Sequence, residues 1–155
     1  METKEAIIVL YHNMENKVSD VYDNNENVSS ALNSLIEGFE YPDFSHKTIK
    51  QVLLSYFKKN FKPFNPGKCV VAGELIEDYQ ERQEQLFPFI DAHVKMQQGE
   101  LCDDDLIENY LAVFTFSGRL LSSFELFEGR KIFIITDWET EETPRVTTLM
   151  YCEDY

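Results

Sequence analysis

Apolar residues recur every three to four positions over most of the first 62 residues, which is typical of amphipathic helices. Three helices are predicted from this spacing, over residues 4–22, 28–39 and 46–61. Within the first, the run Ile7–Leu10 alone would also fit a strand, but the wider stripe favours a helix. Ser45 is a suitable N-cap for the third helix, and Gly38 and Pro42 are expected to end the second.

A turn-rich link, "KPFNPGK", follows the third predicted helix. Two prolines and a glycine within seven residues interrupt both helices and strands. We therefore predict that the chain divides there, into a helical N-terminal region of residues 1–62 and an α+β domain of residues 63–155.

The second half is expected to begin with a short strand, "KCVVAG". A helical stretch should run onward from Glu74, with Pro88 kinking or restarting it near Phe87. Asp103, Asp104 and Asp105 suit the N-terminus of a further helix, because acidic side chains complement the helix dipole there. Gly118 is expected to end that helix.

Three strand-like runs then fall between Gly118 and Tyr151. A glycine-bearing turn, "FEG", joins the first two as a hairpin. The central run "KIFIITDW" is almost continuously apolar, which indicates burial on both faces over part of its length. The predicted fold is therefore α+β, with a three-stranded antiparallel meander packed by helices. Residues 130–151 are interpreted as its scaffold.

Composition supports a compact body, since 43% of the 155 residues are hydrophobic and 14% are aromatic. No apolar run approaches the ~20 residues needed to cross a bilayer, and the first residues are too polar for a secretory signal. Three widely spaced cysteines argue against a disulfide framework. We therefore expect free thiols, a cytoplasmic location and no membrane association.

Charge is distributed unevenly along the chain, which has 14 basic and 28 acidic residues and a net charge of −14. Residues 44–73 contain six lysines and no acid, so the remainder carries a net charge of −20. Such a field repels nucleic acid and favours a partner with a basic surface. The alternative is that the acids serve solubility alone.

The lysine-rich stretch, residues 47–68, admits two interpretations. Interleaved aromatic residues would suit a phosphate-binding face of a nucleic-acid-binding module. Alternatively, the stretch is an internal counter-surface on which acids of the second half dock, and this interpretation is favoured because six lysines are a modest basic footprint.

Three acidic groups are the predicted partner-binding residues. They lie on a predicted helix over residues 74–84, at the start of the next helix, and in the loop after "KIFIITDW". Carboxylates spaced along a helix can imitate the charges of a duplex, which carries one negative charge per ~1.7 Å. The predicted residues are Glu74, Glu77, Asp78, Glu81, Glu84, Asp103, Asp104, Asp105, Glu139, Glu141 and Glu142.

Catalytic and metal chemistry is weakly indicated. His93 and Cys102 could contribute to a metal site, and Cys69 or Cys102 could pair with His93 in a Cys–His site. No paired ligand spacing such as CxxC or HxxxH accompanies them. Surface exposure of His93 is the expected alternative. Asp137 and Glu139 could share a face near Glu125, and we interpret them as part of a negative patch. No metal, cofactor or catalytic residue is predicted.

The ordered motifs "GRLLSSFELFEGRKIFIITDWE" and "RVTTLMYCEDY" give the second half a family resemblance. Over about residues 68–155 the chain resembles small uncharacterised proteins of plasmids, phages and integrative elements, whose pattern contains GRLLS, KIWIITE and a terminal VTT-LLPEEY. Here "QGEL" replaces that family's GDWG, and the turn after the central strand is longer. The resemblance implies a mobile-element setting, often beside anti-restriction genes, and implies no activity.

Together these features predict an acidic, non-enzymatic interaction protein of a phage or other mobile element. Its sharper form is a DNA-mimicking inhibitor of a host DNA-binding defence system. The alternatives are a small metal-dependent or Cys/His enzyme and a nucleic-acid-binding accessory protein.

Overall fold

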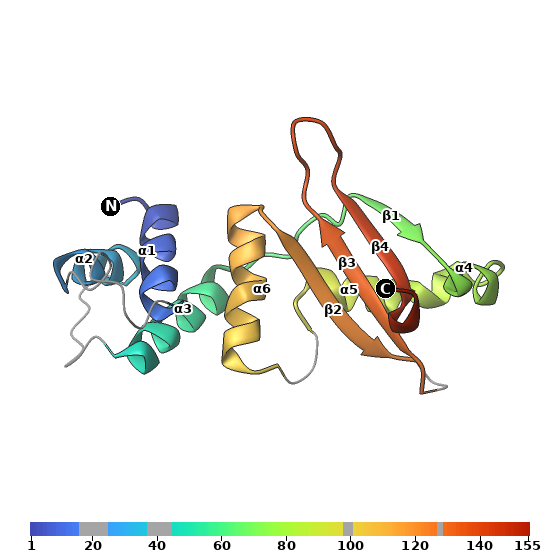
Figure 1. Ribbon diagram of the computed structural model, residues 1–155, viewed down its shortest axis with the longest axis horizontal. Helices are drawn as coiled ribbons and strands as arrows, with labels where there is room; N and C mark the ends of the chain where they lie inside the picture. Colours follow the sequence, from blue (N-terminus) through green and yellow to red (C-terminus); the bar gives the residue numbers. More distant parts are fainter. Residues whose placement is uncertain (16–24, 37–44, 98–100, 127–128) are drawn as a thin grey trace. The chain divides into compact units, whose positions relative to one another are not determined.

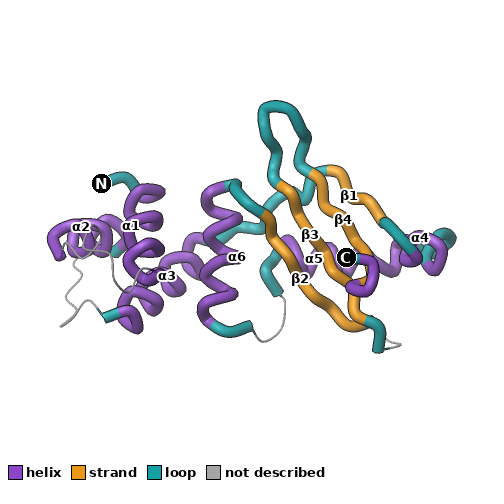
Figure 2. Tube along the Cα trace, in the orientation of Figure 1, coloured by secondary structure: helices purple, strands orange, loops and turns teal. Residues whose placement is uncertain are grey.

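The computed structural model describes residues 1–15, 25–36, 45–97, 101–126 and 129–155, and its elements are drawn in Figures 1 and 2. The chain forms two compact units. The first comprises Met1–Phe61 and Cys102–Thr115, and the second comprises Lys62–Leu101 and Phe116–Tyr155. The chain first passes from one unit to the other after Phe61, next to the predicted division at residue 62. It then returns to the first unit over residues 102–115, which a single division of the chain does not predict.

Four helices build the first unit: α1 (Thr3–Glu15), α2 (Asn25–Leu35), α3 (His46–Asn60) and α6 (Asp103–Thr115). All four were predicted. The Ser45 hydroxyl caps α3 by accepting a hydrogen bond from the Thr48 N–H at 3.3 Å. The apolar stripes face inward, and the Phe57 ring stacks on that of Tyr110 with centroids 5.5 Å apart. Gly38 and Pro42 lie outside the described residues.

The second unit contains a four-stranded sheet in the order β1-β4-β3-β2. Its strands are β1 (Lys68–Val71), β2 (Arg119–Glu125), β3 (Lys131–Asp137) and β4 (Val146–Tyr151). Strands β2, β3 and β4 form the predicted antiparallel meander, and β1 adds to the edge of β4 in parallel. The α+β prediction is confirmed, but the sheet is mixed and has four strands instead of three.

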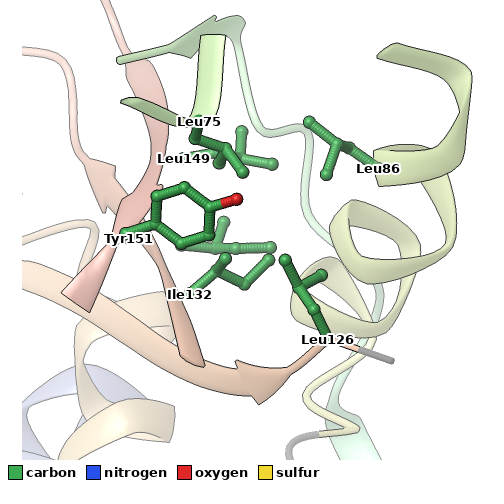
Figure 3. Packing of buried hydrophobic residues seen from close by; sticks show 7 residues of the cluster. Leu75, Leu86, Leu126, Ile132, Leu149 and Tyr151 are labelled. Atoms are coloured by element: carbon green, nitrogen blue, oxygen red, sulfur yellow. The ribbon is translucent and has the colours of Figure 1, made fainter. Parts of the chain in front are cut away.

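One face of this sheet carries the hydrophobic core of the second unit. Side chains from β3 and β4, including Ile132 and Leu149, meet Leu75 and Leu86 from the helical connection (Figure 3). The connection consists of α4 (Glu74–Asp78), the short 3-10 helix η1 (Gln83–Leu86) and α5 (Phe87–Val94). Burying each such side chain contributes about 1.5–3 kcal/mol, so this layer fixes the connection on the sheet.

The predicted helix over residues 74–84 is wrong, because α4 ends at Asp78 and a turn follows. Leu75 and Leu86 explain the break. Both belong to one cluster around Leu149 and Tyr151, whereas a continuous helix would place them about 16 Å apart along its axis. The predicted restart near Phe87 is confirmed, with Pro88 in the first turn of α5.

The opposite face of the sheet is partly covered by the C-terminus. The short 3-10 helix η2 (Cys152–Asp154) leads to Tyr155, whose ring contacts that of Phe133 edge-on at 5.5 Å. Ile135 on this face is buried, as is Ile134 on the other, so the predicted burial of the central strand on both faces is confirmed. Among the described residues, no helix is both long and apolar enough to cross a membrane.

Candidate functional site

Arg130 organises the first acidic group. Its guanidinium lies 3.3 Å from the Glu74 carboxylate, 3.0 Å from that of Glu153 and 3.6 Å from that of Asp78. It also lies over the Tyr151 ring, 3.5 Å from the centroid. The register of β3 and β4 explains this arrangement, because Ile132 pairs with Tyr151 and Arg130 stands just before β3.

Tyr151 ties this group to the core. Its ring is buried, and its hydroxyl donates to the Asp78 carboxylate at 2.5 Å. Burial raises the pKa of Tyr151, and the hydrogen bond to the carboxylate raises it further, so the phenol stays protonated at neutral pH. Two predicted partner residues, Glu74 and Asp78, therefore have partners within the same chain, although both remain exposed.

Glu77, Glu81 and Glu84 behave differently. All three are exposed, and within the described part of the chain none forms an ion pair with a cationic side chain. They lie on the end of α4, on the turn that follows it and on η1. Carboxylates without an internal counter-charge stay available to a cationic partner. We call these three residues the connection acids.

The third predicted group lies in the loop between β3 and β4, where Arg145 holds Glu139 in place. Arg145 donates to both oxygens of Glu139, at 2.6 and 2.7 Å, and this contact lowers the pKa of Glu139. Arg145 also lies 4.8 Å from the centroid of the buried Trp138 ring. Glu141 and Glu142 are exposed on this loop.

The second predicted group, at the start of α6, belongs to the first unit. Asp103, Asp104 and Asp105 are exposed and form the first turn of α6. Asp104 forms an ion pair with Lys50 of the lysine-rich helix α3. This pairing agrees with the internal counter-surface interpretation of the lysines, because an acid that follows the link in sequence docks on a lysine that precedes it.

His93 is buried, so the expected surface position is wrong. It projects from α5 and lies between two hydroxyls of the sheet, Ser122 on β2 at 2.5 Å and Thr136 on β3 at 2.7 Å. Thr136 contacts Thr147 on β4 at 2.8 Å, and Thr147 donates to the carbonyl of Pro66 at 2.7 Å. These five residues form a polar chain through the core, which we call the His93 chain.

Hydrogen-bond chemistry fixes the direction of the His93 chain. The Pro66 carbonyl can only accept, so the single hydroxyl proton of Thr147 is committed to it. Thr147 must therefore accept from Thr136, and Thr136 from the Nε2–H of His93. Nδ1 is left to accept from Ser122. The imidazole is neutral in this arrangement, and burial lowers its pKa to about 4.

The His, Cys and Asp residues considered for metal or Cys–His chemistry are divided between the two units. His93 lies in the second unit, whereas Cys102 and the aspartates after it lie in the first. Partial burial raises the pKa of the Cys69 thiol, which disfavours the nucleophilic thiolate. Among the described residues, no cluster of three or more His, Cys, Asp and Glu side chains could hold a metal ion.

The suggested carboxylate pairing near Glu125 is also wrong. The hairpin register places Glu125 opposite Lys131 and Asp137 opposite Arg119, at the two ends of the β2–β3 ladder. Asp137 is instead bound by Arg119 at 2.9 Å. An antiparallel register reverses the order of residues along the partner strand, which separates these acids.

Sequence reasoning did not identify Arg130, Tyr151 or the His93 chain as features of the site. The inward alternation of Ser122, Thr136 and Thr147 on neighbouring strands is the signal that could have indicated a buried polar partner. No protein-family model, curated protein or solved structure matches this chain. The resemblance to mobile-element proteins therefore stays a prediction.

Proposed function

We propose that this chain is an acidic, non-enzymatic interaction protein whose second unit binds a partner protein with a basic surface. The supporting observation is how the acids divide between internal and external roles. Arg130 and Arg145 form ion pairs with Glu74, Asp78 and Glu139. The connection acids, in contrast, are exposed and have no counter-charge in the described part of the chain. A cationic surface would supply that counter-charge.

The proposed setting is a phage or other mobile element, in line with the resemblance of residues 68–155. A host defence enzyme that binds DNA would present the required basic surface. The narrower proposal, mimicry of DNA, needs carboxylates at regular spacing along a helix. Because α4 ends at Asp78, we favour recognition of a basic protein surface over imitation of a duplex.

A charge-reversal experiment tests this proposal. The first variant carries Glu77→Lys, Glu81→Lys and Glu84→Lys. The matched control carries the same number of reversals at exposed acids of the first unit outside the predicted set, Glu2→Lys, Glu5→Lys and Glu108→Lys. Each form captures proteins from host lysate, and each captured partner is then purified and titrated against all three forms by calorimetry.

We expect the wild type and the control to bind the same purified partner, with affinity that falls as salt rises. The first variant should bind at least about tenfold more weakly. Equal binding by all three forms would refute the proposed surface, as would the failure of the wild type to bind any protein. Competition with duplex DNA tests the narrower proposal, because duplex DNA must displace a DNA mimic from the partner.

A further inference from the structure

Arg82 differs from the other arginines of this protein. The chain has four arginines, and Arg119, Arg130 and Arg145 each hold at least one carboxylate. Arg82 has no such partner among the described residues. A guanidinium presents a planar fork of donors that matches carboxylates and phosphates. In a protein with twice as many acids as bases, an arginine without a carboxylate invites an explanation.

The Arg82 side chain lines a polar pocket in the second unit. The pocket has a volume of about 170 Å³, and its other lining residues are Asp78, Tyr79 and Tyr151. Pockets that bind drug-sized molecules measure roughly 300–1,000 Å³. The Arg82 pocket is therefore suited to a ligand of a few heavy atoms.

Asp78 gives this pocket a second, opposite charge. One carboxylate oxygen of Asp78 accepts from the Tyr151 hydroxyl and faces Arg130. Its other oxygen has no partner within the described residues. Asp78 and Arg82 are four residues apart and would meet on a continuous helix, but α4 ends between them and no ion pair joins them in the described structure. The turn holds the carboxylate and the guanidinium on a shared pocket.

We propose that the Arg82 pocket binds a small zwitterion of the amino-acid class. The ligand carboxylate would bind the Arg82 guanidinium, and its ammonium group would bind the free oxygen of Asp78. Tyr79 also lines the pocket, and a phenolic hydroxyl can accept from or donate to either group. A simple anion would be repelled by Asp78, and a simple cation by Arg82, so only a ligand with both charges satisfies both walls. None of the connection acids lines this pocket, so the two sites can be tested separately.

Titration of the full chain with matched small molecules tests the pocket. Glycine and β-alanine carry both charges at two separations, whereas acetate and methylammonium carry one charge each. Binding is followed at constant ionic strength by the NMR shifts of the Asp78, Tyr79 and Arg82 amides and the Arg82 Nε–H. The variants are Arg82→Gln, Asp78→Asn, and Arg119→Gln as the control arginine that is already paired. The dispersion of each spectrum shows whether the variant is folded.

At least one of the two zwitterions should give saturable shifts, with acetate and methylammonium at least about tenfold weaker. Arg82→Gln should lose about tenfold or more in zwitterion affinity, and Arg119→Gln should not change it. Asp78→Asn should reverse the preference and bind acetate better than the wild type does, which a merely structural role for Asp78 would not produce. Saturation by neither zwitterion, equal binding of acetate by the wild type, or unchanged affinity in Arg82→Gln would overturn the proposal.

Discussion

At the scale of single residues, two arginines of the second unit bind several of its carboxylates. Arg130 forms ion pairs with three carboxylates, and Arg145 binds one carboxylate in a bidentate contact. These ion pairs are exposed, whereas a buried polar group needs a partner because leaving it unsatisfied costs about 1–3 kcal/mol. The His93 chain meets this requirement with side-chain hydroxyls and one proline carbonyl. Charged side chains that have no partner among the described residues, such as Arg82 and the connection acids, are therefore the candidates for binding a ligand or a partner protein.

The neutral state of His93 predicts that acid destabilises the second unit. Its folded pKa of about 4 lies below the ordinary value of 6.5. The unfolded chain therefore binds a proton that the folded chain does not, and stability falls as the pH drops from 6.5 toward 4. Between about pH 7 and about pH 4.5, this residue should remove about 2 kcal/mol from the free energy of unfolding.

Urea titrations followed by the fluorescence of Trp138, which is the only tryptophan and is buried in the second unit, measure this loss. A His93→Gln variant is the control, because it begins less stable but lacks the titrating group. The wild type should lose about 2 kcal/mol more than His93→Gln over the same pH interval. Equal losses in the two proteins would show that His93 does not sense the pH.

At the scale of elements, the parallel strand β1 depends on a close approach between backbones. Gly67 stands just before β1 with φ +70°, and a Cβ there would overlap the carbonyl of Arg145. That carbonyl accepts from the Lys68 N–H at 3.2 Å, where β1 begins to pair with β4. A side chain at residue 67 would therefore push the edge strand away from the sheet.

Gly67→Ala should destabilise the second unit more than Gly118→Ala does. Both glycines have nearly the same positive φ, +70° and +73°, but a Cβ at Gly118 meets nothing within 4 Å. Backbone strain of about 1–3 kcal/mol is common to both changes, so the difference between them isolates the overlap with Arg145. Hydrogen exchange of the β1 amides provides the measurement, and equal protection in the two variants would contradict this account.

Sequence pattern predicted the elements better than it predicted their partners. The β2–β4 meander follows from local alternation and one glycine turn, whereas β1 pairs with a strand almost eighty residues later. Four residues of "KCVV" do not specify an edge or a direction. The break after α4 was missed because Gln, Glu and Arg at residues 80–85 all favour helix. Long-range packing of Leu75 and Leu86 decides against it.

The candidate site was predicted in part for the same reason. Exposure of the connection acids follows from their charge and was correctly expected. Engagement of Glu74, Asp78 and Glu139 depends on arginines that lie 6 to 56 residues away in sequence, and only the folded register brings them together. His93 was misplaced because its two hydroxyl partners, Ser122 and Thr136, come from two different strands, and only the folded sheet brings them beside α5.

At the scale of the whole molecule, the two units share the negative charge equally. The first has 6 basic and 13 acidic residues, and the second has 8 and 15, so each carries −7. The acids of α6 account for this balance, because they join the lysines of α3 in the first unit. Charge along the sequence therefore overstated the contrast between a basic and an acidic half.

The return of α6 to the first unit predicts what a truncated chain will do. If residues 63–155 are produced alone, α6 loses α1 and α3, against which its buried residues Ile107, Tyr110 and Val113 pack in the first unit. Exposing three such side chains removes about 1.5–3 kcal/mol each of burial energy. A helix of 13 residues is marginal in water without packing.

The amides of α6 should therefore exchange rapidly while those of β2, β3 and β4 stay protected, as hydrogen exchange with mass spectrometry would resolve. Replacing residues 103–115 of the truncated chain by a Gly/Ser linker should lower its binding of a hydrophobic dye without loosening the sheet. Protection of α6 in the truncated chain equal to that in the full chain would instead establish residues 63–155 as a self-sufficient domain.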